Sequence, residues 1–243
     1  MEQRILHRSD SRGLADFGWL LSRHTFSFGS YHDPERMGFG ALRVLNDDVV
    51  AGGMGFGEHP HRDMEIVSIP LSGDLEHQDS MGNRTVIRKG DIQVMSAGTG
   101  VRHSEYNHHS ETPVEFLQIW VYPDRRNVTP RYDQKRLNLE SLRNEWVQVL
   151  SPNLDDDGVW IHQQAWFHMG EFDKDREVPY KTRIKGNGIY AFVIEGEFSV
   201  EGTVLHRRDG LGLTDKDALH VCSHTQNARM LLMEIPMEPM IRH

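Results

Sequence analysis

The chain has 243 residues, of which 37% are hydrophobic and 26% charged, a balance typical of a globular protein with a substantial apolar core. Its formal net charge of -9 argues against general binding to a nucleic-acid backbone, which requires a basic face. Cys222 is the only cysteine, so an intrachain disulfide and a cysteine-based zinc site are excluded.

The start of the chain, MEQRILHRSD, lacks the apolar run of a secretory signal. No later stretch approaches the roughly 18 uninterrupted apolar residues of a membrane span. We therefore expect a soluble cytoplasmic protein that does not associate with membranes. The first forty residues contain several aromatic side chains and should pack on a folded barrel: Trp19, His24, Phe26, Phe28 and Tyr31.

Between residues 53 and 121, short apolar runs alternate with turn residues at intervals of about 8–12 positions. The runs cover residues 66–71, 85–87, 92–95 and 116–121, and sequences such as Ser72-Gly73-Asp74 and Lys89-Gly90-Asp91 separate them. This spacing predicts an all-β unit, either an antiparallel sandwich or a barrel.

The second half of the chain repeats this order of elements. The segment IYAFVIEGEFSVEG at 189–202 has the rhythm of IVSIPLSGDLEH at 66–77, and RRDGLGL at 207–213 resembles RKGDIQV at 88–94. Such self-similarity indicates an internal duplication. We expect an N-terminal domain over residues 1–135 and a C-terminal domain over residues 136–243, joined within the polar segment 123–153, where 139–143 could form a short helix.

Two short polar segments each present two metal-ligating side chains at positions i and i+2. They are His59-Pro60-His61 and His103-Ser104-Glu105. Because side chains alternate between the faces of a strand, both groups of each segment point to the same side. Three imidazoles and one carboxylate on one wall of a pocket would bind a divalent transition metal.

The duplication does not carry these ligands into the second half. Counting back from Gly196 as the equivalent of Gly73, the positions of His59 and His61 fall on Thr182 and Ile184. The region matching His103 and Glu105 contains His224 alone. One imidazole without partners binds an ion poorly, so the C-terminal domain should lack a metal site.

The spacing Gly53-x5-His59-x-His61-x3-Glu65-x7-Gly73 resembles the first motif of the cupins, and Gly90-x5-Ser96-x-Gly98-x4-His103-x3-Asn107 resembles the second. The strings RHTFSFGSYHDP, GFGALRVLNDD, GFGEHPHRDMEIV, LEHQDSMGN and MSAGTGVRHSEYN resemble the pirin family, specifically its bacterial quercetinase-like members. This resemblance implies two tandem cupin (jelly-roll) β-barrels, of which the C-terminal one is degenerate.

The resemblance to pirins also implies the metal ligands, which are the histidines of the HPH segment with the histidine and glutamate of the HSE segment: His59, His61, His103 and Glu105. In many other cupins the carboxylate ligand follows the second histidine by four residues, and this position is Glu65. The i+2 spacing from His103 favours Glu105 instead. Glu65 is then expected to line the pocket or support a ligand.

By the same resemblance, the protein is expected to be a quercetin 2,3-dioxygenase, which opens the central ring of a flavonol with O2 and releases CO. Such a ligand set suits Fe(II) as the expected ion, and also Mn, Co, Ni, Cu or Zn. Glu105 would act as the catalytic base that accepts the proton of the flavonol 3-hydroxyl. A related enolic or phenolic substrate remains open.

Two other functions remain open at this point. The resemblance to pirins also allows a non-enzymatic function, because eukaryotic pirins act as metal-dependent co-regulators of transcription. Such a protein would act on a protein partner without catalysis. A zinc-dependent hydrolase is a weaker alternative. For His24, His32 and His77 the ordinary expectation is structural hydrogen bonding, although any of them could line the pocket. Asn107 could orient a ligand or close a turn.

Overall fold

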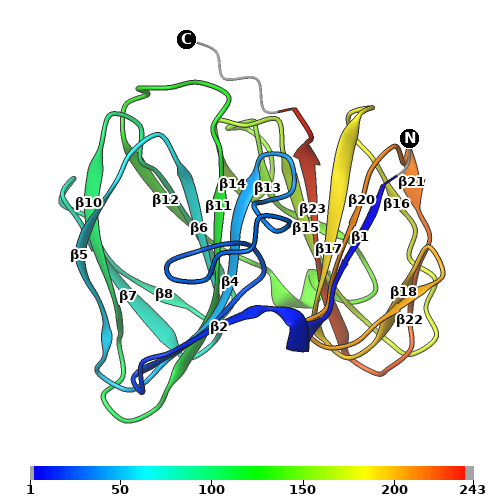
Figure 1. Ribbon diagram of the computed structural model, residues 1–243, viewed down its shortest axis with the longest axis horizontal. Helices are drawn as coiled ribbons and strands as arrows, with labels where there is room; N and C mark the ends of the chain where they lie inside the picture. The colour runs from blue at the N-terminus through cyan, green and yellow to red at the C-terminus, as the bar shows by residue number, and fades with distance from the viewer. Residues whose placement is uncertain (1–2, 239–243) are drawn as a thin grey trace. The chain divides into compact units, whose positions relative to one another are not determined.

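The computed structural model describes residues 3–238 and consists almost entirely of β-strands (Figure 1). Within this range the helical elements are two 3-10 turns, η1 (Ser9–Ser11) and η2 (Leu139–Leu142), so the short helix expected near residue 139 is confirmed. No helix of the described residues is long and apolar enough to span a bilayer.

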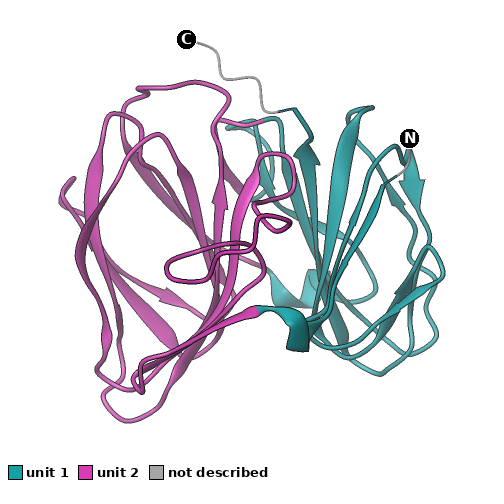
Figure 2. Ribbon diagram, in the orientation of Figure 1, with its two compact units in different colours: residues 1–12, 138–158, 164–238 teal, residues 13–137, 159–163, 239–243 magenta. Residues whose placement is uncertain are grey.

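The chain divides into two compact units (Figure 2). The N-terminal barrel comprises residues 13–137 and 159–163, and the described part of the C-terminal barrel comprises residues 3–12, 138–158 and 164–238. The expected boundary between residues 135 and 136 instead places residues 3–12 in the N-terminal domain and residues 159–163 in the C-terminal domain. The expected all-β fold with two barrels is confirmed.

The strands of the N-terminal barrel are, in chain order, β2 (Gly13–Asp16), β3 (Leu20–His24), β4 (Leu42–Val50), β5 (Gly55–His61), β6 (Glu65–Ser72), β7 (Asp74–Asp79), β8 (Arg84–Arg88), β9 (Asp91–Ser96), β10 (Val101–Asn107), β11 (Val114–Val121), β12 (Arg131–Arg136) and β14 (Val159–Trp160). They include the four strands expected from the apolar runs, as β6, β8, β9 and β11. The larger sheet has the order β12-β9-β6-β11-β4-β3-β2, and the smaller sheet has the order β5-β10-β7-β8.

Neighbouring strands in both sheets are antiparallel, as expected for elements joined by short turns. The turn at Gly73 links β6 in the larger sheet to β7 in the smaller one. Gly73 has a φ of 70°, and a Cβ there would lie 3.0 Å from the carbonyl oxygen of Pro113. Glycine meets both constraints because it has no Cβ.

The interior of the N-terminal barrel contains apolar side chains from both sheets. One cluster includes Leu20 and Phe116 from the larger sheet and Leu75 and Ile87 from the smaller sheet. Each such side chain contributes about 1.5–3 kcal/mol when fully buried. Trp19 packs against this cluster, with its ring 5.4 Å from that of Phe56, and so confirms that the aromatic start of the chain is anchored.

The strands of the C-terminal barrel are β1 (Arg4–His7), β13 (Val147–Ser151), β15 (Trp166–Phe172), β16 (Tyr180–Lys181), β17 (Asn187–Glu195), β18 (Phe198–Val200), β19 (Thr203–Leu205), β20 (Gly210–Leu213), β21 (Ala218–Leu219), β22 (Val221–Ser223) and β23 (Ala228–Pro236). These strands follow one another as β1-β20-β17-β23-β15-β13 in a seven-stranded sheet, and β19-β18-β22 and β16-β21 form smaller sheets. The turn at Gly196 between β17 and β18 repeats the turn at Gly73, which is consistent with the duplication.

The strands of the C-terminal barrel that correspond to β5 and β10 carry other side chains than the predicted ligands. Tyr180 on β16 pairs with Leu219 on β21, and both side chains belong to the apolar core. Thr182 donates its hydroxyl to the carbonyl of Lys216, and Ile184 is 37% exposed. Among residues 3–238, the groups of three metal-ligating side chains lie in the N-terminal barrel.

Candidate metal centre

The pairing of β5 with β10 brings the two predicted ligand segments side by side. His59 lies directly opposite His103, and a bulge between the two pairs then places Glu105 opposite Phe56. Burial alternates along β10, where His103 and Glu105 are each 2% exposed and face the interior. Pro60 is accommodated because β5 is at the edge of its sheet, where a missing N–H costs no ladder bond.

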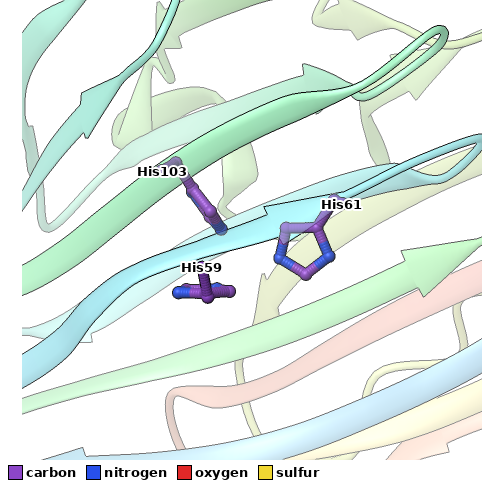
Figure 3. A group of neighbouring side chains, drawn as sticks. All are labelled: His59, His61 and His103. Atoms are coloured by element: carbon purple, nitrogen blue, oxygen red, sulfur yellow. The ribbon is translucent and has the colours of Figure 1, made fainter.

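The imidazoles of His59, His61 and His103 point toward one another (Figure 3). Their ring centroids are 4.4 Å apart for His59 and His103 and 4.9 Å apart for the other two pairs. One nitrogen of each ring lies within 4.8 Å of the others. A single cation with bonds of about 2.0–2.1 Å to nitrogen could bridge such a cluster after small side-chain movements.

The environment keeps two of these imidazoles neutral. Burial, together with the neighbouring rings of His103 and His59, lowers the pKa of His61 from 6.5 to about 4, although Glu105 opposes the shift. Burial and the rings of His59 and His77 likewise lower the pKa of His103 to about 3. Both side chains therefore carry free lone pairs at neutral pH, which is the form that binds metals.

Hydrogen bonds show which nitrogens are available to a metal. The Nδ1 of His59 lies 2.8 Å from the carbonyl oxygen of Gly57, which can only accept, so Nδ1 carries the proton and Nε2 is a bare acceptor. The Nε2 of His103 is buried and has no hydrogen-bond partner within the described residues. An unsatisfied buried nitrogen is costly unless an ion or ligand occupies the site, so the residues present fit a metal.

Glu105 lies beside His103 and forms a second group of candidate metal ligands with His103 and His77. Its carboxylate and the rings of His103 and His77 place their ligand atoms within 4.8 Å of one another. The structure thus gathers the four predicted ligands around His103 as two overlapping groups, with His59 and His61 in one and Glu105 in the other. His61 is also fixed by Trp120 on β11, whose ring centroid is 4.9 Å away.

Two polar side chains of the larger sheet hold the carboxylate of Glu105. Ser68 donates its hydroxyl to Oε1 at 3.1 Å, and Gln118 donates Nε2–H to Oε2 at 2.7 Å. Sequence reasoning missed both residues, and for His77 it favoured structural or ligand-supporting hydrogen bonding while leaving the pocket wall open. The available signal was a polar residue inside each of two strongly apolar runs, IVSIPL and FLQIWV, because buried polar groups require a partner.

Glu65 does not line the pocket, which corrects the expectation for this residue. Side chains alternate along β6, so Glu65 faces away from Ser68 and from the imidazoles. It accepts a hydrogen bond of 2.6 Å from the hydroxyl of Ser96. Its charged neighbours are Arg131 and Asp124, and Glu65 therefore belongs to the other face of the sheet.

The remaining polar residues singled out in the sequence have structural contacts. Asn107 closes a turn, since its amide donates to the carbonyls of Val50 and Thr112. His108 and His109 are exposed and pair with Glu76 and Asp74. His24 packs against Phe28, and His32 is exposed.

An open cavity of about 410 Å³ includes His61 in its lining. This volume lies within the range of about 300–1,000 Å³ that is usual for small-molecule sites. Its lining residues are Pro60, His61, Arg62, Ser80, Gly100, Val101 and Arg102. Of the four predicted ligands, the cavity therefore touches His61.

Comparisons with known proteins agree with this architecture. The family model described as Pirin matches residues 7–121, and the model described as the quercetinase C-terminal cupin domain matches residues 133–235. The chain belongs to the pirin family. Quercetin 2,3-dioxygenase of Escherichia coli K12 is 40% identical over 231 residues, covering 95% of this chain and 98% of the relative. The resemblance inferred from the sequence motifs is confirmed.

A second relative and a solved structure extend the comparison. A pirin-like protein of Caulobacter vibrioides is 38% identical, covering 93% of this chain and 96% of the relative. The crystal structure of the Escherichia coli pirin YhhW in complex with nickel(II) superposes with a TM-score of 0.90 at 39% identity, covering 96% of this pirin and 99% of that chain. The fold of two cupin barrels is therefore shared with this relative.

The buried position of Glu65 predicts a pH-dependent loss of stability. Burial raises its pKa from 4.5 to about 7, while an unfolded chain ionises near the ordinary value. The folded state therefore binds the proton more tightly, and the free energy of unfolding should fall as the pH rises from about 4.5 to 7. A full shift of this size corresponds to about 3 kcal/mol, which is an upper limit.

We expect Glu65→Gln to lose less stability than the wild type between pH 5 and pH 8, measured by urea unfolding at both values. Glutamine keeps an acceptor for Ser96 and cannot ionise. Glu35→Gln, at an exposed position, is the matched control and should follow the wild type. Equal losses of stability in Glu65→Gln and the wild type would show that folding does not raise the pKa of Glu65.

Proposed function

We propose that this protein is a metal-dependent dioxygenase of the quercetin 2,3-dioxygenase type, which opens the central ring of a flavonol with O2 and releases CO. The observation that carries the proposal is the cluster of His59, His61 and His103, with a buried lone pair of His103 that no described residue satisfies. The names of the close relatives favour this enzyme over a non-enzymatic regulator.

The proposed ligands of one divalent cation are His59, His61, His103 and Glu105. The Escherichia coli relative was crystallised in complex with nickel(II), which supports a divalent ion as the cofactor of this protein. Imidazole and carboxylate ligands accept several first-row metals, and affinity order does not select among them. We propose Fe(II) as the resident ion in the cytoplasm, with Mn, Co, Ni, Cu and Zn as the alternatives that elemental analysis would distinguish.

A bound divalent metal supplies a Lewis acid that lowers the pKa of a hydroxyl oxygen brought to it. Glu105 is placed to accept the proton that such a hydroxyl releases. Ser68 and Gln118 each use one lone pair on a different carboxylate oxygen, which leaves one lone pair on each oxygen, one for the cation and one for the proton. These two hydrogen bonds also fix the plane of the carboxylate, so that it needs little reorganisation during the transfer.

The substrate would enter through the open cavity beside His61 and approach the imidazoles from the side of β5. Flavonols are planar phenols, and the apolar walls provided by Pro60 and Val101 suit an aromatic ring. Another enolic or phenolic compound would use the same deprotonation. Direct binding to nucleic acid is disfavoured by the net charge of -9, while a protein partner remains compatible with the surface.

The function predicts oxygen-dependent bleaching of a flavonol. Protein loaded with Fe(II) should remove the long-wavelength absorbance band of quercetin in air and release CO, because both ring opening and CO loss require O2. Under nitrogen the band should persist. Binding of quercetin with no oxygen-dependent bleaching by protein loaded with any of the candidate ions would instead support a non-enzymatic, metal-dependent interaction protein.

Loss of one imidazole should abolish both metal binding and turnover. We expect His61→Ala to lose most of its metal, measured by elemental analysis after gel filtration, and to fall to background activity. His109→Ala removes an exposed histidine that pairs with Asp74 and should keep wild-type metal content and rate. Stoichiometric metal in His61→Ala would remove His61 from the ligand set.

Replacement of the carboxylate should separate binding from catalysis. Glu105→Gln retains three imidazoles and an oxygen that can accept from Ser68 or Gln118, so it should keep part of its metal. It loses the proton acceptor, and kcat should fall by about 10²–10⁴-fold. Glu111→Gln, at an exposed position in a turn, is the control. Turnover at the wild-type rate per bound metal would contradict the role of Glu105 as the base.

A further inference from the structure

A chain of three buried side chains runs from β7 to the candidate metal centre. The Oδ2 of Asp79 lies 3.0 Å from Nε2 of His77, and Nδ1 of His77 lies 3.4 Å from Nδ1 of His103. His77 is fully buried, Asp79 is 8% exposed and His103 is 2% exposed. These three side chains therefore lie in the interior of the barrel, where their hydrogen bonds are shielded from water.

Strand register explains why these residues meet. β10 pairs with β5 on one side and β7 on the other, so His103 lies opposite His59 and also opposite Asp79. His77 is two residues before Asp79 on the same face of β7 and reaches His103 diagonally. The ring of Tyr132 packs on His77 at 4.8 Å and restricts its rotation.

The chemistry of the two ends sets the position of each proton. Asp79 accepts backbone N–H groups of Met81 and Asn83 at Oδ1 and the side-chain amide of Asn83 at Oδ2. A carboxylate surrounded by donors acts as an acceptor, so Nε2 of His77 carries the proton. A neutral His77 then has a bare Nδ1, which can only accept. With His77 in this neutral form, the contact between the two Nδ1 atoms places the shared proton on Nδ1 of His103.

The result for His103 is a tautomer with Nδ1–H and a bare Nε2, and Nε2 is the buried atom without a partner among the described residues. His59 reaches the same tautomer through the carbonyl of Gly57. His103 contacts another imidazole at this position, and two imidazoles facing each other could share their proton in either order. Asp79 removes this ambiguity from the far end of the chain.

We propose that His77 and Asp79 are positioning residues that fix His103 as the Nδ1–H tautomer and direct the lone pair of its Nε2 toward the cation. The inference rests on the metal-binding part of the proposed function and adds two residues to it. Contacts of this kind orient metal-ligating histidines, and their removal typically weakens metal affinity by about 10–100-fold.

The first test needs no metal. In metal-free wild-type protein labelled with ¹⁵N-histidine, the ring nitrogen shifts report which nitrogen carries the proton. We expect an Nδ1–H tautomer for His103 and an Nε2–H tautomer for His77 at neutral pH. The opposite tautomer for His103 would overturn the proposal, whatever the activity of the protein.

The second test compares two substitutions of His77. The side-chain oxygen of asparagine occupies about the position of the imidazole Nδ1, so His77→Asn keeps an acceptor for His103, whereas His77→Phe keeps the ring but no acceptor. Calorimetric titration with Ni²⁺ should show a loss of about 10–100-fold in affinity for His77→Phe and a smaller loss for His77→Asn. His109→Phe is the control at an exposed position.

Thermal unfolding of the metal-free variants separates a positioning role from a role in folding. If His77 had a purely structural role, its substitutions would lower the melting temperature, and His77→Asn and His77→Phe would have the same metal affinity. Wild-type affinity in a folded His77→Phe, or equal losses in the two variants, would overturn the proposal. Failure of the wild-type protein to bind Ni²⁺ or any other candidate ion would instead overturn the proposed function, and the NMR measurement would still decide the tautomer.

Discussion

The antiparallel pairing of β5 with β10 is the constraint on which the candidate site depends. It sets His59 opposite His103 and, through the bulge that follows, brings Glu105 opposite Phe56 on the interior face. A slip of one residue would turn the ligands of one strand to the opposite face of the sheet. The apolar side chains of the barrel core oppose such a slip, because the same change would expose them to water.

A second constraint is the satisfaction of polar groups inside the barrel. Burial of an unpaired polar group costs several kcal/mol in the most apolar surroundings, so each interior polar side chain needs a partner. Ser68 and Gln118 support Glu105, and Asp79 supports His77, which in turn contacts His103. These contacts hold the site together before a cation binds, and they leave a lone pair of His103 directed at the shared space.

The two barrels share a topology but differ in the side chains that corresponding strands carry within residues 3–238. The turn at Gly196 repeats the turn at Gly73, and the pairing of β16 with β21 corresponds to the pairing of β5 with β10. In the C-terminal barrel these strands contribute Tyr180 and Leu219 to the apolar core. The duplication thus conserved the backbone arrangement, while the interior side chains determine which copy can bind a metal.

Local periodicity was sufficient to predict much of this protein from its sequence. The strands, the Gly turns, the duplication and the inward orientation of His59, His61, His103 and Glu105 follow from alternation over two residues and from turn chemistry, which involve neighbours in the chain. The family resemblance of the same motifs added the barrel topology. The expected boundary between residues 135 and 136 placed residues 3–12 in the N-terminal domain and residues 159–163 in the C-terminal domain. The compact units divide these two segments the other way, because each segment joins its barrel through contacts distant in sequence.

The tertiary structure alone decided the surroundings of the ligands. β6 is buried on both of its faces, so its sequence could not tell whether Glu65 or Ser68 points into the barrel. His77 meets His103 because β7 and β10 are neighbours in the sheet although they are far apart in the chain. Alternation along a strand is a local property that the sequence determines, whereas the partner across the sheet is set by the order and register of strands, which only the folded chain defines.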